Sequence, residues 1–197
     1  TSDRVGISTA AAGMISGLFF LIALVCRPFC GVLSDKLNKL SLVKVAVIMM
    51  GVGTLGYSLS TSLQGIIFFR IVNGVGFAVN STALISLVTQ YIPRSHMGEG
   101  IGYFGLAHVI ASAAGPGLGA ATAECLGIRG VFLVSSGICL IEVIMLCAFS
   151  FDARPDVSGK KRRRFVFNDV IAIPALGYTL VASVFSVVNG IISTYLV

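Results

Sequence analysis

The segment Gly31-Val-Leu-Ser-Asp35-Lys36-Leu-Asn-Lys39 is a short charged stretch between two long apolar runs of the chain. An apolar run of about 20 residues has the length that a helix needs to cross about 30 Å of hydrocarbon. A few charged residues between two such runs are expected to form a tight turn at the edge of a bilayer. The segment therefore predicts a helical hairpin in a membrane.

The composition of the whole chain also indicates a membrane protein. Of the 197 residues, 56% are hydrophobic and only 11% are charged, which would leave a water-soluble chain of this size with too little polar surface. The apolar runs are continuous rather than alternating, so they favour helices over the strands of a membrane barrel. Six spans are expected, at residues 11–33, 42–62, 65–91, 99–123, 129–151 and 170–197.

The Lys and Arg residues fall mainly on one side of the expected bilayer. Ten of them lie in or beside the segments 34–41, 92–98 and 152–168, whereas Arg4 and Arg129 lie on the alternate side. Because cytoplasmic loops are enriched in Lys and Arg, the three segments are predicted to be cytoplasmic loops of a multi-pass protein of the cell (inner or plasma) membrane. The basic run 160–164 is expected to contact anionic membrane lipid, and nucleic acid is not an expected partner.

Three motifs together resemble the major facilitator superfamily. The segment 31–39 resembles its loop signature G-x-L-[AS]-D-[KR]-x-G-[KR]. Arg70-Ile-Val-Asn73-Gly74-Val-Gly76 resembles its fourth-helix pattern R-x-x-x-G-x-G, and residues 111–120 resemble its fifth-helix antiporter pattern G-x-x-x-G-P-x-x-G-G, with alanine at both end positions. In the loop, Asn38 replaces the usual glycine, and asparagine tolerates the left-handed conformation that a tight turn can require.

The resemblance implies an all-α membrane protein with a major-facilitator-type helical bundle. Six of the twelve transmembrane helices of such a bundle would lie within this sequence. Residues 1–157 would form the amino-terminal bundle (second to sixth helices), 158–168 a basic cytoplasmic linker, and 169–197 the seventh helix, which starts the carboxy-terminal bundle. The implied activity is secondary active transport, in which a monomeric protein exports a small amphipathic molecule in exchange for protons by alternating access. A proton-coupled uptake symporter of a polar solute and a non-transporting membrane sensor or scaffold are the alternatives.

The loop motif is the expected cytoplasmic gate. Gly31 permits close approach of two helices, and Asp35 can cap a helix or form an ion pair at the membrane edge. Lys36 and Lys39 can bind carboxylates or lipid phosphates across a short turn. The alternative is a simple hairpin whose positive charges only set the topology.

A stripe of small residues marks the expected helix pivot. Ala111, Gly115 and Gly119 recur every four residues, so a neighbouring helix can approach this face closely. Pro116 removes one intrahelical hydrogen bond and favours a kink. Ordinary packing of small residues is the alternative for this stripe.

Polar and ionisable residues within the spans are candidates for a proton or substrate path, because such groups are costly in hydrocarbon unless they face a cavity or a partner. His108 lies roughly 13 Å into its helix, near the depth at which transporters bind substrates, and a histidine there can titrate near neutral pH. For His108, the alternative is a neutral histidine that is hydrogen-bonded to a carbonyl group. For Glu142, the alternative is structural pairing with another group. The predicted path comprises Arg70, Asn73, Asn80, His108, Ser112 and Glu142.

The sequence holds no signature of an enzyme or a cofactor site. It contains no phosphate-binding loop, catalytic triad or paired catalytic carboxylates. Its five cysteines show no Cys-x-x-Cys or Cys/His spacing typical of a metal site. We therefore expect no enzymatic activity, no cofactor and no metal.

Overall fold

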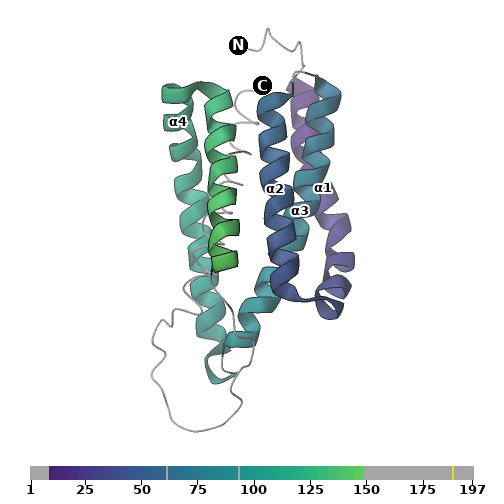
Figure 1. Cartoon of the computed structure of the whole chain (residues 1–197), viewed down its shortest axis with the longest axis vertical. Helices are drawn as coiled ribbons and strands as arrows, with labels where there is room; N and C mark the ends of the chain where they lie inside the picture. Colours follow the sequence, from purple (N-terminus) through teal and green to yellow (C-terminus); the bar gives the residue numbers. More distant parts are fainter. Residues whose placement is uncertain (1–8, 61, 93, 149–187, 189–197) are drawn as a thin grey trace.

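The described residues of the computed structural model, 9–60, 62–92, 94–148 and 188, are mainly long helices. In chain order these are α1 (Thr9–Lys36), α2 (Lys39–Leu59), α3 (Leu63–Tyr91), the short 3₁₀ helix η2 (Arg94–His96) and α4 (Met97–Ala148) (Figure 1). All four α-helices of the described part are long and apolar enough to cross a membrane. The first five expected spans fall on these helices, the fourth and fifth on the two halves of α4. The sixth span and the predicted linker lie outside the described residues.

Two turns show how local chemistry divides the apolar runs. Asn38 caps the start of α2, where its side-chain oxygen accepts a hydrogen bond from the backbone N–H of Leu40 at 3.0 Å. Its φ of −65° and ψ of 114° are extended, so this turn does not use the left-handed conformation that asparagine tolerates. An N-cap residue needs an extended backbone to aim its side chain at the first helical turn. Ser62 caps α3 in the same way, with its hydroxyl accepting from Gly65 at 3.2 Å.

Gly127 divides α4 into two helices. Its φ of 71° and ψ of 172° are not helical, and this backbone region is accessible essentially to glycine alone. The break falls between Glu124 and Arg129, where the spacing of the apolar runs predicts the turn. The backbone remains helical through Pro116. After Gly127 the chain reverses, so the two halves of α4 run antiparallel and side by side (Figure 1).

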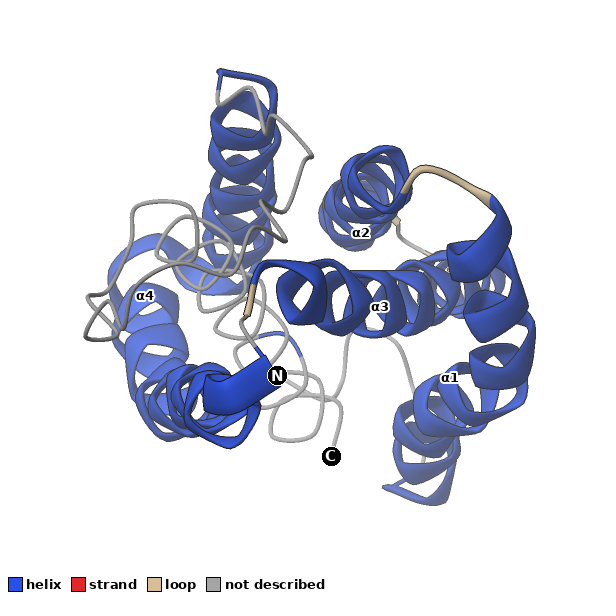
Figure 2. Cartoon of the chain, turned by 90° about the horizontal axis from the view of Figure 1, so that it is seen from below, coloured by secondary structure: helices blue, strands red, loops and turns tan. Residues whose placement is uncertain are grey.

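α3 packs between α1 and α2, and α2 also packs against α4 (Figure 2). Glycines allow these approaches. A Cβ atom placed on Gly53 of α2 would lie 3.1 Å from the Cβ atom of Asn73, and one placed on Gly76 of α3 would lie 3.1 Å from the carbonyl oxygen of Ala46. Since both distances are shorter than ordinary van der Waals contacts, the α2–α3 packing depends on bare backbone at these positions.

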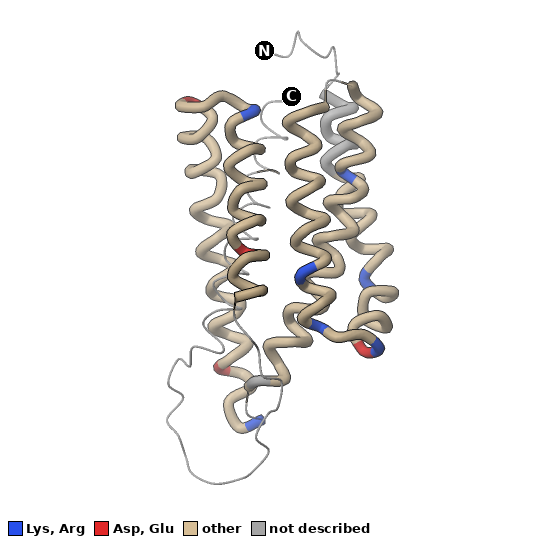
Figure 3. The backbone as a smooth tube through the Cα atoms, viewed as in Figure 1, with Lys and Arg blue, Asp and Glu red and all other residues tan. Residues whose placement is uncertain are grey.

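The outer surface of the bundle is apolar, as the bilayer requires. Large hydrophobic side chains such as Phe29 of α1, which is 72% exposed, face outward along the helices. Many of the Lys, Arg, Asp and Glu residues lie toward the two ends of the bundle, and others lie along the helices between the ends (Figure 3). The distribution fits helices that cross a hydrocarbon layer and place their charges in water or headgroups.

Candidate functional site

Buried polar side chains in the helices mark the candidate site, because polar groups are rarely placed inside a membrane bundle without a partner or a role. Two of them are ionisable: Arg70 of α3 is 0% exposed and Glu142 of α4 is 1% exposed. Within the described ranges, the full buried polar set is Ser34, Thr54, Arg70, Asn73, Asn80, Ser135, Ser136 and Glu142.

Arg70 contacts helices on both sides of α3. The guanidinium carbon lies 4.9 Å from the ring centroid of Phe19 on α1, within range of a cation–π interaction. On the other side, the hydroxyl group of Tyr57 on α2 is an electrostatic neighbour of the same guanidinium. An arginine stays charged under all physiological conditions, so these contacts surround a permanent cation in the interior.

Asn73 lies about one turn after Arg70 and fixes α3 to α2. Its side-chain amide donates hydrogen bonds to the Met50 carbonyl and to the Thr54 hydroxyl, both at 3.2 Å. The Thr54 hydroxyl donates in turn to the Met50 carbonyl at 2.8 Å. We refer to these residues together as the Arg70 cluster, which comprises Phe19, Met50, Thr54, Tyr57, Arg70 and Asn73.

A second polar face lies on the second half of α4. Ser136 donates a hydrogen bond to the Gly51 carbonyl of α2 at 3.3 Å, and a Cβ atom on Gly51 would lie 3.2 Å from the Cβ atom of Cys139. The side-chain oxygen Oε2 of Glu142 is buried and has no hydrogen-bond partner in the described structure. We refer to Ser135, Ser136, Cys139 and Glu142 as the α4 polar face.

Sequence reasoning identified Glu142 of this face but missed Ser135 and Ser136. A usable signal was present, because Ser135, Cys139 and Glu142 follow a spacing of four and three residues, which places them on one side of a helix. The serines are small and uncharged, so they do not interrupt the apolar run and were not singled out.

The Arg70 cluster and the α4 polar face lie on different sides of α2. Tyr57 belongs to the first, yet its ring is also 5.5 Å from the ring of Phe132 on α4. In the described part of the chain, Arg70 and Glu142 form no ion pair with each other, and the ion pair found there joins His96 to Glu99 at 3.3 Å. The predicted path residues therefore do not form one group.

The remaining path residues are dispersed as well. Asn80 is buried on α3, two turns after Asn73. His108 is half-buried and Ser112 is exposed, one turn apart on the first half of α4. The structure thus joins Arg70 and Asn73 with residues of α1 and α2, and places His108, Ser112 and Glu142 on α4.

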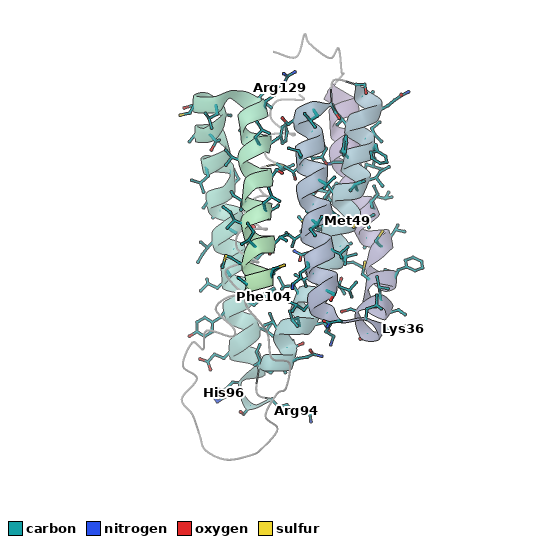
Figure 4. The ribbon with its side chains drawn as sticks, viewed as in Figure 1. Lys36, Met49, Arg94, His96, Phe104 and Arg129 are labelled. Atoms are coloured by element: carbon teal, nitrogen blue, oxygen red, sulfur yellow. The ribbon has the colours of Figure 1, made fainter. Side chains whose placement is uncertain are left out.

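The predicted gate residues lie at one end of the bundle. Asp35 and Lys36 are exposed, while Gly31 and Lys39 are half-buried. Figure 4 places Lys36 and Arg94 toward the same end and Arg129 at the opposite end. Asp35 has no ion-pair partner among the residues that the structure describes. Its carboxylate is therefore accessible to a partner at the bundle surface.

The predicted pivot residues lie partly inside and partly on the surface of the bundle. Ala111, Gly115 and Gly119 are buried, and the residues between them are exposed. Pro116 is among the exposed ones. The small residues thus form the inward face of the first half of α4, as the four-residue spacing indicates.

Comparison with known proteins agrees with this architecture. The family model described as Major Facilitator Superfamily matches residues 2–197. The chain belongs to the major facilitator superfamily. It is accordingly a multi-pass membrane protein, as the helices of the described part also indicate. The resemblance of the three motifs is thereby confirmed at the level of the family.

Relatives in this superfamily include proteins named for drug resistance. The multi-drug resistance efflux pump PmrA of Streptococcus pneumoniae is 31% identical over 147 residues, which are 73% of this chain and 36% of PmrA. The multidrug resistance protein MdtG of Citrobacter koseri is 26% identical over 152 residues, 76% of this chain and 37% of MdtG. The chain thus spans about a third of the length of these curated relatives. No solved structure shows significant similarity to it.

Proposed function

We propose that the protein is a secondary active transporter that exports small amphipathic molecules in exchange for protons by alternating access. Membership of the major facilitator superfamily and the names of the efflux relatives support the class. The observation that carries the proposal is the complete burial of Arg70 in contact with residues of both α1 and α2.

A buried cation of this kind is sensitive to helix movement. Arg70 has the face of the Phe19 ring and the Tyr57 hydroxyl as neighbours, and these come from two other helices. Any rearrangement of α1 or α2 relative to α3 changes the electrostatic environment of the guanidinium, and a change in that environment biases the rearrangement in return. Arg70 is therefore the residue that we assign to coupling between charge and conformation.

Asn73 provides a fixed contact between α2 and α3 close to Arg70. Its hydrogen bonds to Met50 and Thr54 hold α3 against α2 about one turn from Arg70. α2 and α3 then move as one unit, while the Arg70 side chain responds to changes in its electrostatic environment. In this proposal Arg70, Asn73 and Asn80 belong to the interior path, and His108 and Ser112 contribute from α4.

The loop motif has the position that a cytoplasmic gate needs. Asp35 and Lys36 are exposed at the end of α1, so they can form and break contacts without disturbing the packed helices. Asp35→Asn should leave membrane insertion intact and slow export, because the loop loses the carboxylate that a basic partner would hold. Normal export by a well-folded Asp35→Asn variant would exclude the gate role.

A dye exchange assay tests the function and separates the alternatives. The protein at its full natural length is reconstituted in proteoliposomes, a pH gradient is imposed, and ethidium serves as the probe. Antiport predicts ethidium movement opposite to the proton flux and its loss when a protonophore collapses the gradient. Movement in the same direction as protons would indicate the symporter. No gradient-dependent movement of ethidium or of a polar solute would favour the sensor or scaffold.

A further inference from the structure

Glu142 is the buried acidic residue of the helices that the structure describes, and its setting differs from that of Arg70. Its side chain is 1% exposed, and its Oε2 atom is buried without a hydrogen-bond partner in the described structure. The neighbouring Cys139, one turn earlier on α4, is also 1% exposed. The carboxyl group therefore lies in a dry part of the bundle, against the side of α2 that carries Gly51.

Among the residues that the structure describes, no charged group of the surrounding elements forms an ion pair that would compensate a negative charge at this position. On α4 the nearest is the thiol of Cys139, and the first half of α4 adds His108. None of these groups forms an ion pair with Glu142 in the described ranges. The charged residues of the packed elements are Lys39 and Lys44 on α2, Arg70 on α3, and Glu99, Glu124 and Arg129 on α4.

A carboxylate without a counter-charge or hydrogen-bond donors is strongly disfavoured in such surroundings, whereas a neutral carboxylic acid is tolerated. The same carboxyl group is stable as an anion as soon as water reaches it. Its charge is thus tied to whether the bundle around α2 and α4 is closed or open. A residue with this property is suited to carry a proton between two conformations of a transporter.

The α4 polar face extends from this carboxyl toward the Arg129 end of the bundle. Ser135, Ser136 and Cys139 precede Glu142 on the same side of the helix, over a rise of roughly 10 Å at 1.5 Å per residue. Hydroxyl groups along this line can accept and donate hydrogen bonds to water that enters when the helices separate. Glu142 therefore has polar side chains beside it for about two turns of its own helix, beyond which Val131 and Phe132 are buried on the same face.

We propose that Glu142 is the proton-carrying residue of the exchange, an inference that rests on the proposed antiport function. In the conformation described here the carboxyl group holds its proton. When water reaches the group on the cytoplasmic side, the O–H bond breaks, the proton passes to water and a carboxylate remains. When the protein opens to the other side, the carboxylate accepts a proton from water there and returns to the neutral form.

Infrared spectroscopy tests the protonation without any substrate. The full-length protein in lipid at pH 7 should show the C=O stretching band of a protonated carboxyl group, and Glu142→Gln should lack it. Glu124→Gln is the matched control, since Glu124 is exposed at the end of the first half of α4, and it should retain the band. If wild-type protein lacks the band at pH 7, the proposal is overturned.

Transport assays with ethidium test the role of the proton. Glutamine has nearly the shape of a neutral glutamic acid, so Glu142→Gln should fold and should still exchange ethidium between two equal pools without a pH gradient. The initial rate of its gradient-driven ethidium accumulation should fall at least about tenfold, which is about 1.4 kcal/mol in the barrier. Glu142→Asp, which keeps a carboxyl group, should retain gradient-driven transport and serves as the second variant.

The outcomes separate the two proposals. Wild-type protein that moves ethidium in neither assay overturns the proposed function. Wild-type protein that couples ethidium to the gradient, together with a Glu142→Gln variant that couples equally well, overturns only the role of Glu142. Loss of exchange as well as coupling in both Glu142→Gln and Glu142→Asp assigns the residue to packing and also overturns it.

Discussion

The side chain of Asn73 sets the register between α2 and α3. The sequence alone shows only the helix face on which this residue lies. Asn73→Ala removes the donors to the Met50 carbonyl and the Thr54 hydroxyl and leaves space where the amide lies. The free energy of unfolding in detergent micelles should fall by about 1–3 kcal/mol, the usual effect of removing a buried hydrogen-bonded group.

Thr122→Ala is the control for the Asn73 variant. Thr122 is partly exposed and its hydroxyl donates to the Leu118 carbonyl of its own helix at 2.7 Å, so no contact between helices is lost. Its free energy of unfolding should stay within about 0.5 kcal/mol of wild type. An equal loss of stability in both variants would show that the hydrogen bonds of Asn73 do not join the two helices.

Arg70→Lys keeps the charge of the cluster but loses its planar geometry. A guanidinium stacks on the Phe19 ring and presents a fixed fork of donors, whereas an ammonium is a compact and strongly hydrated charge. Ethidium export by the full-length protein should slow about tenfold, equivalent to about 1.4 kcal/mol in the barrier.

Two further variants serve as controls for the effect of Arg70→Lys on ethidium export. Arg27→Lys on the exposed face of α1 should export ethidium at the wild-type rate. Combining Arg70→Lys with Phe19→Leu should cost no more than the larger single effect, because both changes remove the same contact. Unchanged export by Arg70→Lys would remove Arg70 from the mechanism.

The Arg70 cluster also shows where sequence reasoning stops. The helical spacing of Arg70 and Asn73 is visible in the sequence, and so is the unusual position of a charge in an apolar run. The contacts of Arg70 with Phe19 and Tyr57 are not visible in the sequence. Spacing within one helix does not tell which other helices pack on it or at what height. Contacts between helices depend on packing that involves the whole bundle.

At the level of the helices, Gly127 is the residue on which the reversal of α4 depends. Gly127→Ala should lower the free energy of unfolding by about 1–3 kcal/mol, although a Cβ atom there would meet no other atom within 4 Å. The effect would come entirely from the backbone conformation, with its φ of 71°. Thermal unfolding of the purified protein in detergent is the measurement.

Gly117→Ala provides the matched comparison for this turn. Gly117 lies in the first half of α4, and a Cβ atom added to it would likewise meet nothing within 4 Å, but its backbone is helical. Its stability should be unchanged or higher by about 0.5–1 kcal/mol, because alanine favours a helix more than glycine does. Equal destabilisation by both substitutions would argue against a conformational cause at Gly127.

The helix ends divide into features that sequence predicts and features that it does not. The turn near residue 127 follows from the lengths of the two apolar runs and from Glu124 and Arg129 beside it. The conformation of Asn38 does not follow from the sequence, because the family pattern has a glycine at this position whereas the chain uses an extended asparagine N-cap. Run length fixes where a turn falls, and the side chain at the cap decides its geometry.

For the whole molecule, α2 connects the two proposed charge sites. It packs against α3 beside Arg70 and against α4 beside Glu142, and Tyr57 contacts both neighbours. In the proposed mechanism, a change of charge at Glu142 would act on Arg70 through movement of α2. The sequence predicted both residues as path members, but it could not show that they lie on opposite sides of a shared helix.

The orientation of the bundle in the membrane is the last prediction. Lys36 and Arg94 lie toward one end and Arg129 at the other (Figure 4), and the sequence predicts ten Lys and Arg residues, these two included, for the side of Lys36 and Arg94. Positive loops are retained in the cytoplasm, so Lys36 and Arg94 should be intracellular and Arg129 extracellular. Single cysteines at these positions, in a variant whose five native cysteines are replaced by serine, report the side directly.

In intact cells, a membrane-impermeant maleimide should label Arg129→Cys and leave Lys36→Cys and Arg94→Cys unlabelled until the membrane is permeabilised. The substitutions themselves should not reverse the protein, because each removes one positive charge from a difference of ten against two. Labelling of Lys36→Cys and Arg94→Cys from outside would reverse the assigned orientation. Labelling of only one of these two would contradict the arrangement of α1, α2 and α3 itself, since an even number of crossings must separate the two loops.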